Sequence, residues 1–317
     1  MSPSIDVAES ETSQKPAIAR NVQNVVLGDV LFKTWYPSFY PEELVGKDVE
    51  RLYVCRWCFK YCKDLAPYIA HKNLCPAKQE DPPGRIIYEK DPYWIYEVDG
   101  EEDKACARLF TQNLSLFAKL FLDNKSVFYD VSSFNYYLLV YDKVSSTTDE
   151  DPGPANSQIV GFFSKEKMSW DNNNLACILV FPPWQRRGLG KILMAASYEL
   201  SKREGRIGGP EKPLSELGKK GYMRFWESRV TKAILKLRAK HSISIRDIAL
   251  ECWMLDEDVV SVLKEMDLIE PRKKGNAKSM LRKEKLREWA TTQVVDLESP
   301  VDYDAFVQES SPEPMED

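Results

Sequence analysis

The sequence predicts an α+β fold, with a central β-sheet between an N-terminal metal-binding region and a helical, winged-helix-like C-terminal region. Three observations indicate this arrangement. Cysteine and histidine residues stand at metal-ligand spacing between residues 52 and 76. Runs rich in β-branched and aromatic residues follow, with helix-like segments between them. From Phe225 onward the apolar pattern is helical.

The composition fits a globular chain that buries a sizeable core, since 43% of its 317 residues are hydrophobic and 11% are aromatic. The longest apolar runs, such as LACILVF, are far shorter than the roughly 18–20 residues that span a bilayer, so we expect no membrane association. The N-terminus lacks the basic start and apolar core of a secretory signal. Cysteines at metal spacing favour a reducing, intracellular compartment over a disulfide framework.

Charge is unevenly distributed along the chain, whose net charge is −5. From Glu288 to the C-terminus there are nine acidic and no basic residues, and residues 1–15 carry a net −2, which leaves +6 for residues 16–287. We expect the tails, residues 1–17 and 291–317, to be disordered. A mildly basic body suits a protein that works near nucleic acid, although many folded domains carry such a charge without that function.

Short β-type runs open the folded part, interrupted by Gly28, Pro37 and Pro41. The pattern then predicts a β-hairpin over 84–100, an amphipathic helix over 112–125, and strands over 126–131, 135–142 and 158–167. A later helix should end near Glu204. Further on, a short strand precedes two helices that begin near Asp247 and Asp256, as in a helix-turn-helix or winged-helix unit.

The strongest local signal is a zinc-binding pattern. Two residues separate Cys55 from Cys58, twelve separate Cys58 from His71, and three separate His71 from Cys75. Zinc binds four such ligands in a tetrahedron, and four protein ligands close the site, so we expect a structural metal. Cys62 is the spare cysteine of this segment, and we interpret it as a buried or half-buried thiol rather than a fifth ligand.

The stretch LACILVFPPWQRRGLGKILM, from Leu175 to Met194, predicts a strand, a turn and a helix. Pro182 and Pro183 end the strand. Glycines leave the backbone N–H groups of the turn accessible, and the helix directs its positive end to the same place, as in a pyrophosphate site. Taken alone, the pattern fits an ordinary glycine turn equally well, and Cys177 in the strand fits a core cysteine.

With the sequences around it, this stretch resembles the MYST family of histone lysine acetyltransferases. The resemblance covers residues 18–290 and rests on TWYPSFYPEEL, the Cys-Cys-His-Cys finger, PPGRIIY, LFAKLFLDNKSVFYD, GFFSKEK, QRRGLGK, LSKREG and GPEKPLSELG. DNKS, NNLACILVFPP, RRGLG and GPE after a glycine look like the SAS branch, the catalytic subunits of the fungal silencing complex.

The resemblance implies a MYST-type acetyltransferase domain over 18–290. Within it, the zinc finger spans 52–76. An acetyl-CoA-binding catalytic core with a central mixed β-sheet and a GNAT-like fold spans 105–225. A helix-turn-helix-like region spans 226–290.

The family match also implies two catalytic residues. Glu211, in GPEKPLS, matches the general base that removes a proton from the substrate lysine. A useful base needs a pKa raised from its ordinary value of about 4.3, which burial beside the cofactor would supply. Cys177 matches the active-site cysteine, either as an acyl acceptor or as a wall of the pocket. We favour direct attack, with Glu211 indispensable and Cys177 contributory.

For acetyl-CoA, the resemblance implies backbone contacts along the strand and pyrophosphate contacts in the turn. The strand contacts are Ile178, Leu179 and Val180, and the turn contacts are Gln185, Arg186, Arg187, Gly188, Leu189, Gly190 and Lys191. Ser215 matches a cofactor contact and a candidate proton donor to the leaving thiolate. Arg224 stands where the family has a second serine contact, which leaves that contact in doubt.

Lys125 matches a lysine that becomes autoacetylated in the family, although Asn124 replaces the family's preceding histidine. The alternative for Lys125 is a lysine at a helix end that points to water.

The resemblance implies acetyl transfer from acetyl-CoA to a histone-tail lysine, with core histone four as the expected substrate, in nuclear chromatin regulation and silencing. Partners would be the histone tail or nucleosome and accessory subunits of an acetyltransferase complex. The basic run over 271–287 suggests non-specific DNA contact, or equally a solvated helix face.

Three other functions stay open: a catalytically weak chromatin-binding scaffold subunit, an acetyltransferase for non-histone proteins, and one for a small amine, which the finger disfavours. His241 is the only histidine outside the finger, so a Ser-His-Asp triad or a histidine-based metal hydrolase is hard to build.

Overall fold

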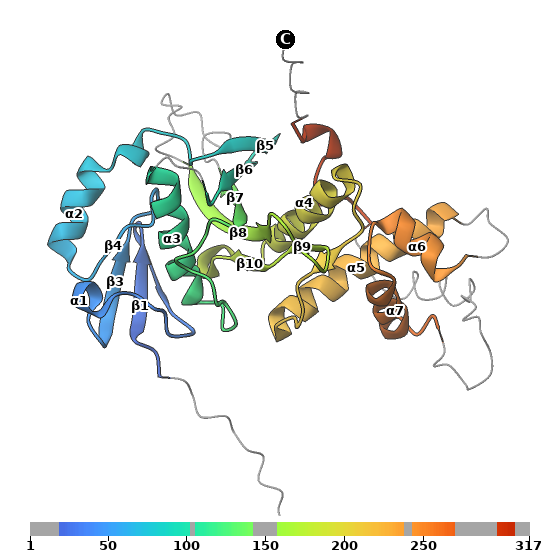
Figure 1. Cartoon of the computed structure of the whole chain (residues 1–317), viewed down its shortest axis with the longest axis horizontal. Helices are drawn as coiled ribbons and strands as arrows, with labels where there is room; N and C mark the ends of the chain where they lie inside the picture. Colours follow the sequence, from blue (N-terminus) through green and yellow to red (C-terminus); the bar gives the residue numbers. More distant parts are fainter. Residues whose placement is uncertain (1–18, 102–104, 142–156, 238–242, 270–296, 308–317) are drawn as a thin grey trace, which may run out of the picture.

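The computed structural model describes residues 19–101, 105–141, 157–237, 243–269 and 297–307 (Figure 1). Several expectations therefore lie outside the described residues: those for the tail 1–17, for His241, for the basic run 271–287 and for most of the acidic tail. None of the helices in the described ranges is both long enough and apolar enough to cross a bilayer.

The N-terminal part is a four-stranded sheet of order β2-β1-β3-β4, in which β1 and β3 run parallel. Its strands are β1 (Val22–Leu27), β2 (Val30–Lys33), β3 (Val49–Val54) and β4 (Tyr61–Cys62). Gly28, at a φ of 63°, makes the turn between β1 and β2, as the break in the β-type run predicts. Three short helices accompany the sheet: α1 (Glu42–Val45), α2 (Leu65–Leu74) and the 3-10 turn η1 (Pro76–Lys78).

The central part is a five-stranded sheet of order β10-β8-β7-β6-β5, antiparallel in every pairing. Its strands are β5 (Arg85–Lys90), β6 (Tyr93–Asp99), β7 (Phe134–Tyr141), β8 (Gln158–Glu166) and β10 (Cys177–Val180). The predicted hairpin and two of the three predicted strands are confirmed. The prediction of a mixed central sheet is wrong for the described strands, because every pairing in this sheet is antiparallel. The short strand β9 (Asn173–Leu175) pairs in parallel with β11 (Gly209–Pro210) in a separate two-stranded sheet.

Alternate residues of the central sheet face two separate cores. Leu138 and Phe162 pack with the helix α3 (Ala105–Lys119) and the N-terminal sheet. Leu139 and Phe163 pack on the opposite face, with the helix α4 (Leu189–Arg203). Figure 1 shows these two helices on opposite sides of the sheet. Because both faces are covered, β8 is buried along nearly its whole length.

The strand expected over 126–131 does not form. Phe128 stacks on Phe39 with ring centroids 4.8 Å apart. The Val131 carbonyl accepts a hydrogen bond from Phe134 N–H at 3.1 Å and lies so close to Gly100 that an added Cβ would meet it at 1.9 Å. The β-rich segment therefore packs as an irregular connection, which these contacts hold in place.

The C-terminal part is helical as predicted, with α5 (Glu216–Lys236), α6 (Ile245–Cys252) and α7 (Asp256–Glu265). The second helix begins at the expected Asp256. Ser244 rather than Asp247 caps α6, and the two residues form a capping box. No strand lies between α5 and α6 among the described residues, so the expected short strand is absent there and only the two helices of the expected unit are present.

Residues 297–307, which the sequence places in a disordered acidic tail, instead pack along α4 and beside β5 (Figure 1). Val307 N–H donates to the Ile87 carbonyl at 3.0 Å, and Phe306 packs against the ring of Tyr88 at 4.8 Å. The Arg203 guanidinium lies over Phe306. This stretch contains the 3-10 turn η6 (Tyr303–Ala305). Its order follows from buried Val301 and Phe306, which offset the chain entropy that a polar tail could not.

A substitution of Gly161 can test how closely β10 packs against β8. An added Cβ there would meet the Leu179 carbonyl oxygen at 2.7 Å, so we expect Gly161→Ala to lower the free energy of unfolding by about 1–3 kcal/mol, measured by urea denaturation. Gly190→Ala is the matched control, because an added Cβ there meets no atom within 4 Å, and it should cause no loss. Equal stability of the two variants would contradict the close packing of these strands.

Candidate active site and metal centre

The four predicted metal ligands come together in the structure. Cys55 and Cys58 lie in the turn between β3 and β4, while His71 and Cys75 lie at the end of α2. Their ligand atoms are all within 4.8 Å of one another. Cys58 Sγ is 3.3 Å from His71 Nε2, and Cys75 Sγ is 3.7–3.8 Å from the other two thiols. Three sulfurs and one imidazole nitrogen, converging in this way, fit a structural zinc ion.

A tight knuckle presents the first two thiols. Phe59 adopts a φ of 57° and is fully buried, while Cys55 N–H and the Cys55 carbonyl bond to Lys60 and Phe59, respectively. A hydrogen bond from the Cys58 thiol lowers the pKa of Cys55 to about 5, which favours the thiolate that zinc binds. Cys62 lies half-buried on β4 outside the cluster, as expected for the spare cysteine.

The expected cofactor turn follows the edge strand β10. After the 3-10 turn η4 (Pro182–Trp184), Gln185 Nε2 donates back to the Val180 carbonyl at 2.8 Å. Arg186 and Gly188 then take left-handed conformations, with φ of 63° and 82°. Gly188 is the residue from which α4 starts. The strand–turn–helix predicted from the sequence is therefore present.

This turn is suited to an anion. Arg186, Arg187 and Gly188 are exposed. None of the backbone N–H groups of residues 186–190 donates to another residue of the described chain. These donors, the two arginines and the positive end of the 15-residue helix α4 together form a site for negative charge. Leu189 is buried beneath the turn, and Gly190 and Lys191 form the first turn of the helix.

The two predicted catalytic residues lie on neighbouring strands. Cys177 is the first residue of β10 and pairs with Ser164 of β8. Glu211 directly follows β11, and its backbone N–H donates to the Leu175 carbonyl at 2.9 Å. This bond attaches Glu211 to Leu175, which lies two positions before Cys177 in the chain. Glu211 itself lies 34 positions after Cys177 in the sequence. Ile178 and Val180 are half-buried on the same strand, and Leu179 is buried.

The electrostatic environment of Glu211 favours a base. Although the residue as a whole is exposed, partial burial of its carboxyl group and, second, the charge of Glu166 raise its pKa above the ordinary value. Both effects disfavour the carboxylate. A carboxyl group with a raised pKa holds a proton more readily than an ordinary glutamate, which is the property that proton transfer from an amine requires.

An anchor that sequence reasoning missed holds the segment after Glu211. The Lys212 ammonium pairs with Glu257 and, at 2.7 Å, with Asp258 of α7. The Asp258 side chain is only 3% exposed, and Gly209 sits so close that an added Cβ would meet its Oδ2 at 2.6 Å. This ion pair ties the predicted base to the C-terminal helices. The lysine beside Glu211 is a signal in the sequence, but its partner 46 residues away is not.

Lys125 is buried with 6% exposure, so the alternative of a helix-end lysine pointing to water is wrong. Burial lowers the pKa of this ammonium group, and the charge of Cys177 opposes that shift. Ser215 caps α5, where its Oγ accepts a hydrogen bond from Gly218 N–H at 3.1 Å. Arg224 is exposed further along that helix.

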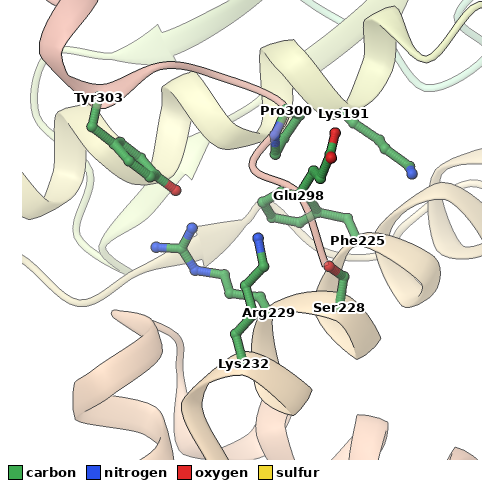
Figure 2. A pocket seen from close by; sticks show the side chains of 8 residues that line it. All are labelled: Lys191, Phe225, Ser228, Arg229, Lys232, Glu298, Pro300 and Tyr303. Carbon is green, nitrogen blue, oxygen red and sulfur yellow. The ribbon is translucent and has the colours of Figure 1, made fainter. Parts of the chain in front are cut away.

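A small cavity of about 40 Å³ lies beside the turn, where α5, the start of α4 and the C-terminal segment meet. It is lined by Lys191, Phe225, Ser228, Arg229, Lys232, Glu298, Pro300 and Tyr303 (Figure 2). Three of these are cationic. Arg229 is fixed by its bond to the Cys252 carbonyl and by the ring of Tyr198, while Glu298 brings one carboxylate to the cavity. The sequence did not predict this cavity, since it depends on the ordered C-terminal segment.

The fold and the candidate sites together define a two-core α/β protein with a candidate zinc finger and a strand–turn–helix suited to an anion. Comparison with known families gives the family. Residues 81–305 match the MOZ/SAS family, and residues 19–75 match the MYST family zinc finger domain. The chain belongs to this family of MYST proteins.

Three relatives of this chain are all named as histone acetyltransferases. The chain is 40% identical over 252 residues to "Histone acetyltransferase Tip60 homolog" of Caenorhabditis elegans, covering 78% of this chain and 51% of the relative. It is 41% identical over 248 residues to "Histone acetyltransferase MOF" of Drosophila melanogaster, covering 78% and 28%. It is 39% identical over 269 residues to "Histone acetyltransferase of the MYST family 1" of Arabidopsis thaliana, covering 85% and 56%. The chain thus spans about a quarter to just over half of the length of these relatives.

The four proposed ligands lead to a prediction about zinc content and thermal stability. Cys58→Ser should reduce bound zinc from one ion per chain to well below one and lower the melting temperature, because a closed structural site contributes folding free energy. Zinc content by plasma mass spectrometry and thermal denaturation measure both effects. Cys62→Ser is the matched control and should keep its zinc. Loss of zinc in the control, or its retention in Cys58→Ser, would contradict the ligand set.

The ion pair between Lys212 and Asp258 leads to a prediction about stability. Lys212→Met should lower the free energy of unfolding by about 1–3 kcal/mol, because it leaves the Asp258 carboxylate buried without its cationic partner. Urea denaturation measures the loss. Lys219→Met, at an exposed position on α5, is the control and should change stability by less than about 0.5 kcal/mol. Equal effects of the two variants would show that the ion pair holds nothing in place.

Proposed function

We propose that this chain is a protein lysine acetyltransferase that transfers the acetyl group of acetyl-CoA to a histone-tail lysine. The observation that carries the proposal is the bond from Glu211 N–H to the Leu175 carbonyl. It fastens a carboxylate with a raised pKa beside the strand that leads into the anion-binding turn. The printed names of the relatives support the reaction and the class of substrate.

Acetyl-CoA would bind along β10 and the turn after it. The edge strand offers the backbone of Ile178, Leu179 and Val180 to the pantetheine arm. The turn from Gln185 to Lys191 offers N–H groups and two arginines to the pyrophosphate, which is an anion of the kind such turns bind. The thioester would then lie near Cys177, at the start of the strand.

The substrate lysine arrives as an ammonium ion and must lose a proton before its nitrogen can attack the thioester carbonyl. Glu211 takes that proton. The amine then forms the new amide bond, and the leaving thiolate receives a proton, for which the Ser215 hydroxyl is the candidate donor. Cys177 forms a wall of the pocket in this direct attack, and an acetyl-cysteine intermediate is the alternative.

Several finer assignments follow from the family pattern and belong to the same proposal. The core has a GNAT-like fold, and the C-terminal helices form a winged-helix-like unit. The enzyme belongs to the SAS branch, acts on core histone four in the nucleus and contributes to silencing. Accessory subunits and non-specific DNA contact assist it. Lys125 is acetylated by the enzyme itself, and its burial and its electrostatic interaction with Cys177 support this assignment.

The role of Glu211 can be tested through the pH dependence of the rate. Only the carboxylate accepts a proton, so kcat/KM should rise with pH through a pKa above the ordinary glutamate value. Glu211→Gln should lower kcat about 100- to 10,000-fold and remove that ascending limb. Initial rates of CoA release with histone octamers measure both effects, and mass spectrometry identifies the acetylated lysine.

Glu216→Gln is the matched control, since this exposed glutamate lies in the first turn of α5. It should keep the wild-type rate and pH profile. A Glu211→Gln enzyme within twofold of wild type would overturn the base assignment. Wild-type protein that releases no CoA with octamers, nucleosomes or nuclear extract would overturn the proposed function and favour the scaffold alternative.

A further inference from the structure

The loop between β8 and β9, residues 167–172, presents two large apolar side chains to water. Met168 is 79% exposed, and Trp170 is 96% exposed, more than any other large hydrophobic side chain in the described ranges. Single exposed apolar residues are common on protein surfaces. An indole almost entirely in water, two residues from an exposed methionine, nevertheless contributes nothing to the packing of this fold and is available to a partner.

Both ends of this loop lie next to the strand that leads to Glu211. The loop begins after Glu166, the residue whose charge acts on Glu211. It ends at Asn172, whose carbonyl is so close to Gly208 that an added Cβ would meet it at 2.4 Å. The following residue, Asn173, pairs with Gly209 of β11. The loop therefore borders the proposed site of proton transfer.

Hydrogen bonds fix the loop at both ends. Lys167 N–H donates to the Ser133 carbonyl at 2.9 Å, and Asn173 N–H donates to Ser169 Oγ at 3.1 Å. The Lys167 side chain is also held, by Asp99 at 2.7 Å and Glu101 at 2.8 Å. Because these anchors hold the residues on either side of Met168 and Trp170, the outward presentation of the two apolar side chains is built into the loop.

The charges around the loop are mostly negative. Glu166, Asp171 and Glu211 bring three carboxylates, and the ammonium of Lys167 is already matched by two acidic partners. Carboxylates raise the local concentration of cations, and the face of an indole binds a lysine or arginine head group directly. An exposed tryptophan among carboxylates is thus complementary to a basic, flexible peptide.

We propose that Met168 and Trp170 form a docking surface for the basic peptide that carries the acetylated lysine, with Trp170 contacting a lysine or arginine that flanks the target. This inference rests on the proposed function and adds to it the residues that select the substrate. Charge complementarity commits the surface to a basic peptide rather than to a second copy of this chain. The surface recognises the flanking sequence, while Glu211 acts on the target lysine itself.

The test compares Trp170→Ala with wild type, using a synthetic peptide that has one lysine flanked by glycine and arginine. We expect the KM for this peptide to rise about 3- to 10-fold, with kcat and the KM for acetyl-CoA within about twofold of wild type. Trp170→Phe, which keeps an aromatic face, should recover part of the loss. A peptide with glutamate flanks should be insensitive to the substitution. Leu44→Ala, at an exposed apolar position on α1, is the matched control.

Peptide binding in the presence of CoA, measured by calorimetry, separates this inference from the proposed function. If wild type is inactive but its peptide Kd weakens in Trp170→Ala, the docking surface stands and the proposed function fails. If wild type is active and Trp170→Ala has the wild-type KM and Kd, the docking surface is overturned and the function stands. Peptide binding by neither protein, or self-association of wild type that Trp170→Ala abolishes in sedimentation, also overturns the docking surface.

Discussion

The arrangement of the candidate active site depends on one short parallel pairing, β9 with β11. Its last hydrogen bond joins Glu211 N–H to the Leu175 carbonyl. The chain enters the pairing through β9, forms the cofactor strand, the turn and α4, and returns at β11, so the pairing closes a loop that contains both halves of the site. Such closeness requires glycine at position 208, because an added Cβ there would lie 2.4 Å from the Asn172 carbonyl oxygen. This backbone pairing therefore fixes where proton transfer and cofactor binding would meet in the proposed reaction.

Features encoded by neighbouring residues could be predicted from the sequence. The four zinc ligands lie within a span of 21 residues, and the knuckle and the helix that present them are local structures. The hairpin, α3 and the strand–turn–helix follow from periodicity and turn residues in the same way. The pairing of Glu211 with the cofactor strand is not local. Only the resemblance to a family could link these residues, since nothing within either segment indicates the other.

What the sequence could not predict depends on contacts between distant segments. Residues 126–131 have a β-rich composition, but contacts with distant residues, Phe128 with Phe39 and Val131 with Gly100, hold them as an irregular connection. The C-terminal segment looks acidic and polar, yet Val301 and Phe306 are buried, and Lys90 pairs with Asp302 across 212 positions. Lys212 finds Asp258 in the same manner. For the first two segments, contacts with distant residues override the local structure that composition predicts. For Lys212, composition predicts no partner at all.

Charged residues of opposite sign lie at the two ends of β10, the strand between the candidate base and the turn. Arg186, Arg187 and Lys191 lie in or next to the turn, whereas Glu166 and Glu211, whose charges interact, lie at the end that holds the candidate base. In the proposed reaction one substrate carries phosphates and the other a basic tail, so each is attracted to a different end. Because salt screens exposed charges beyond about 8 Å at physiological ionic strength, each cluster acts mainly on the substrate beside it. Partial burial and, second, the charge of Glu166 raise the pKa of Glu211. In the proposed reaction the carboxylate of Glu166 would therefore both attract the basic tail and add to the basicity of Glu211.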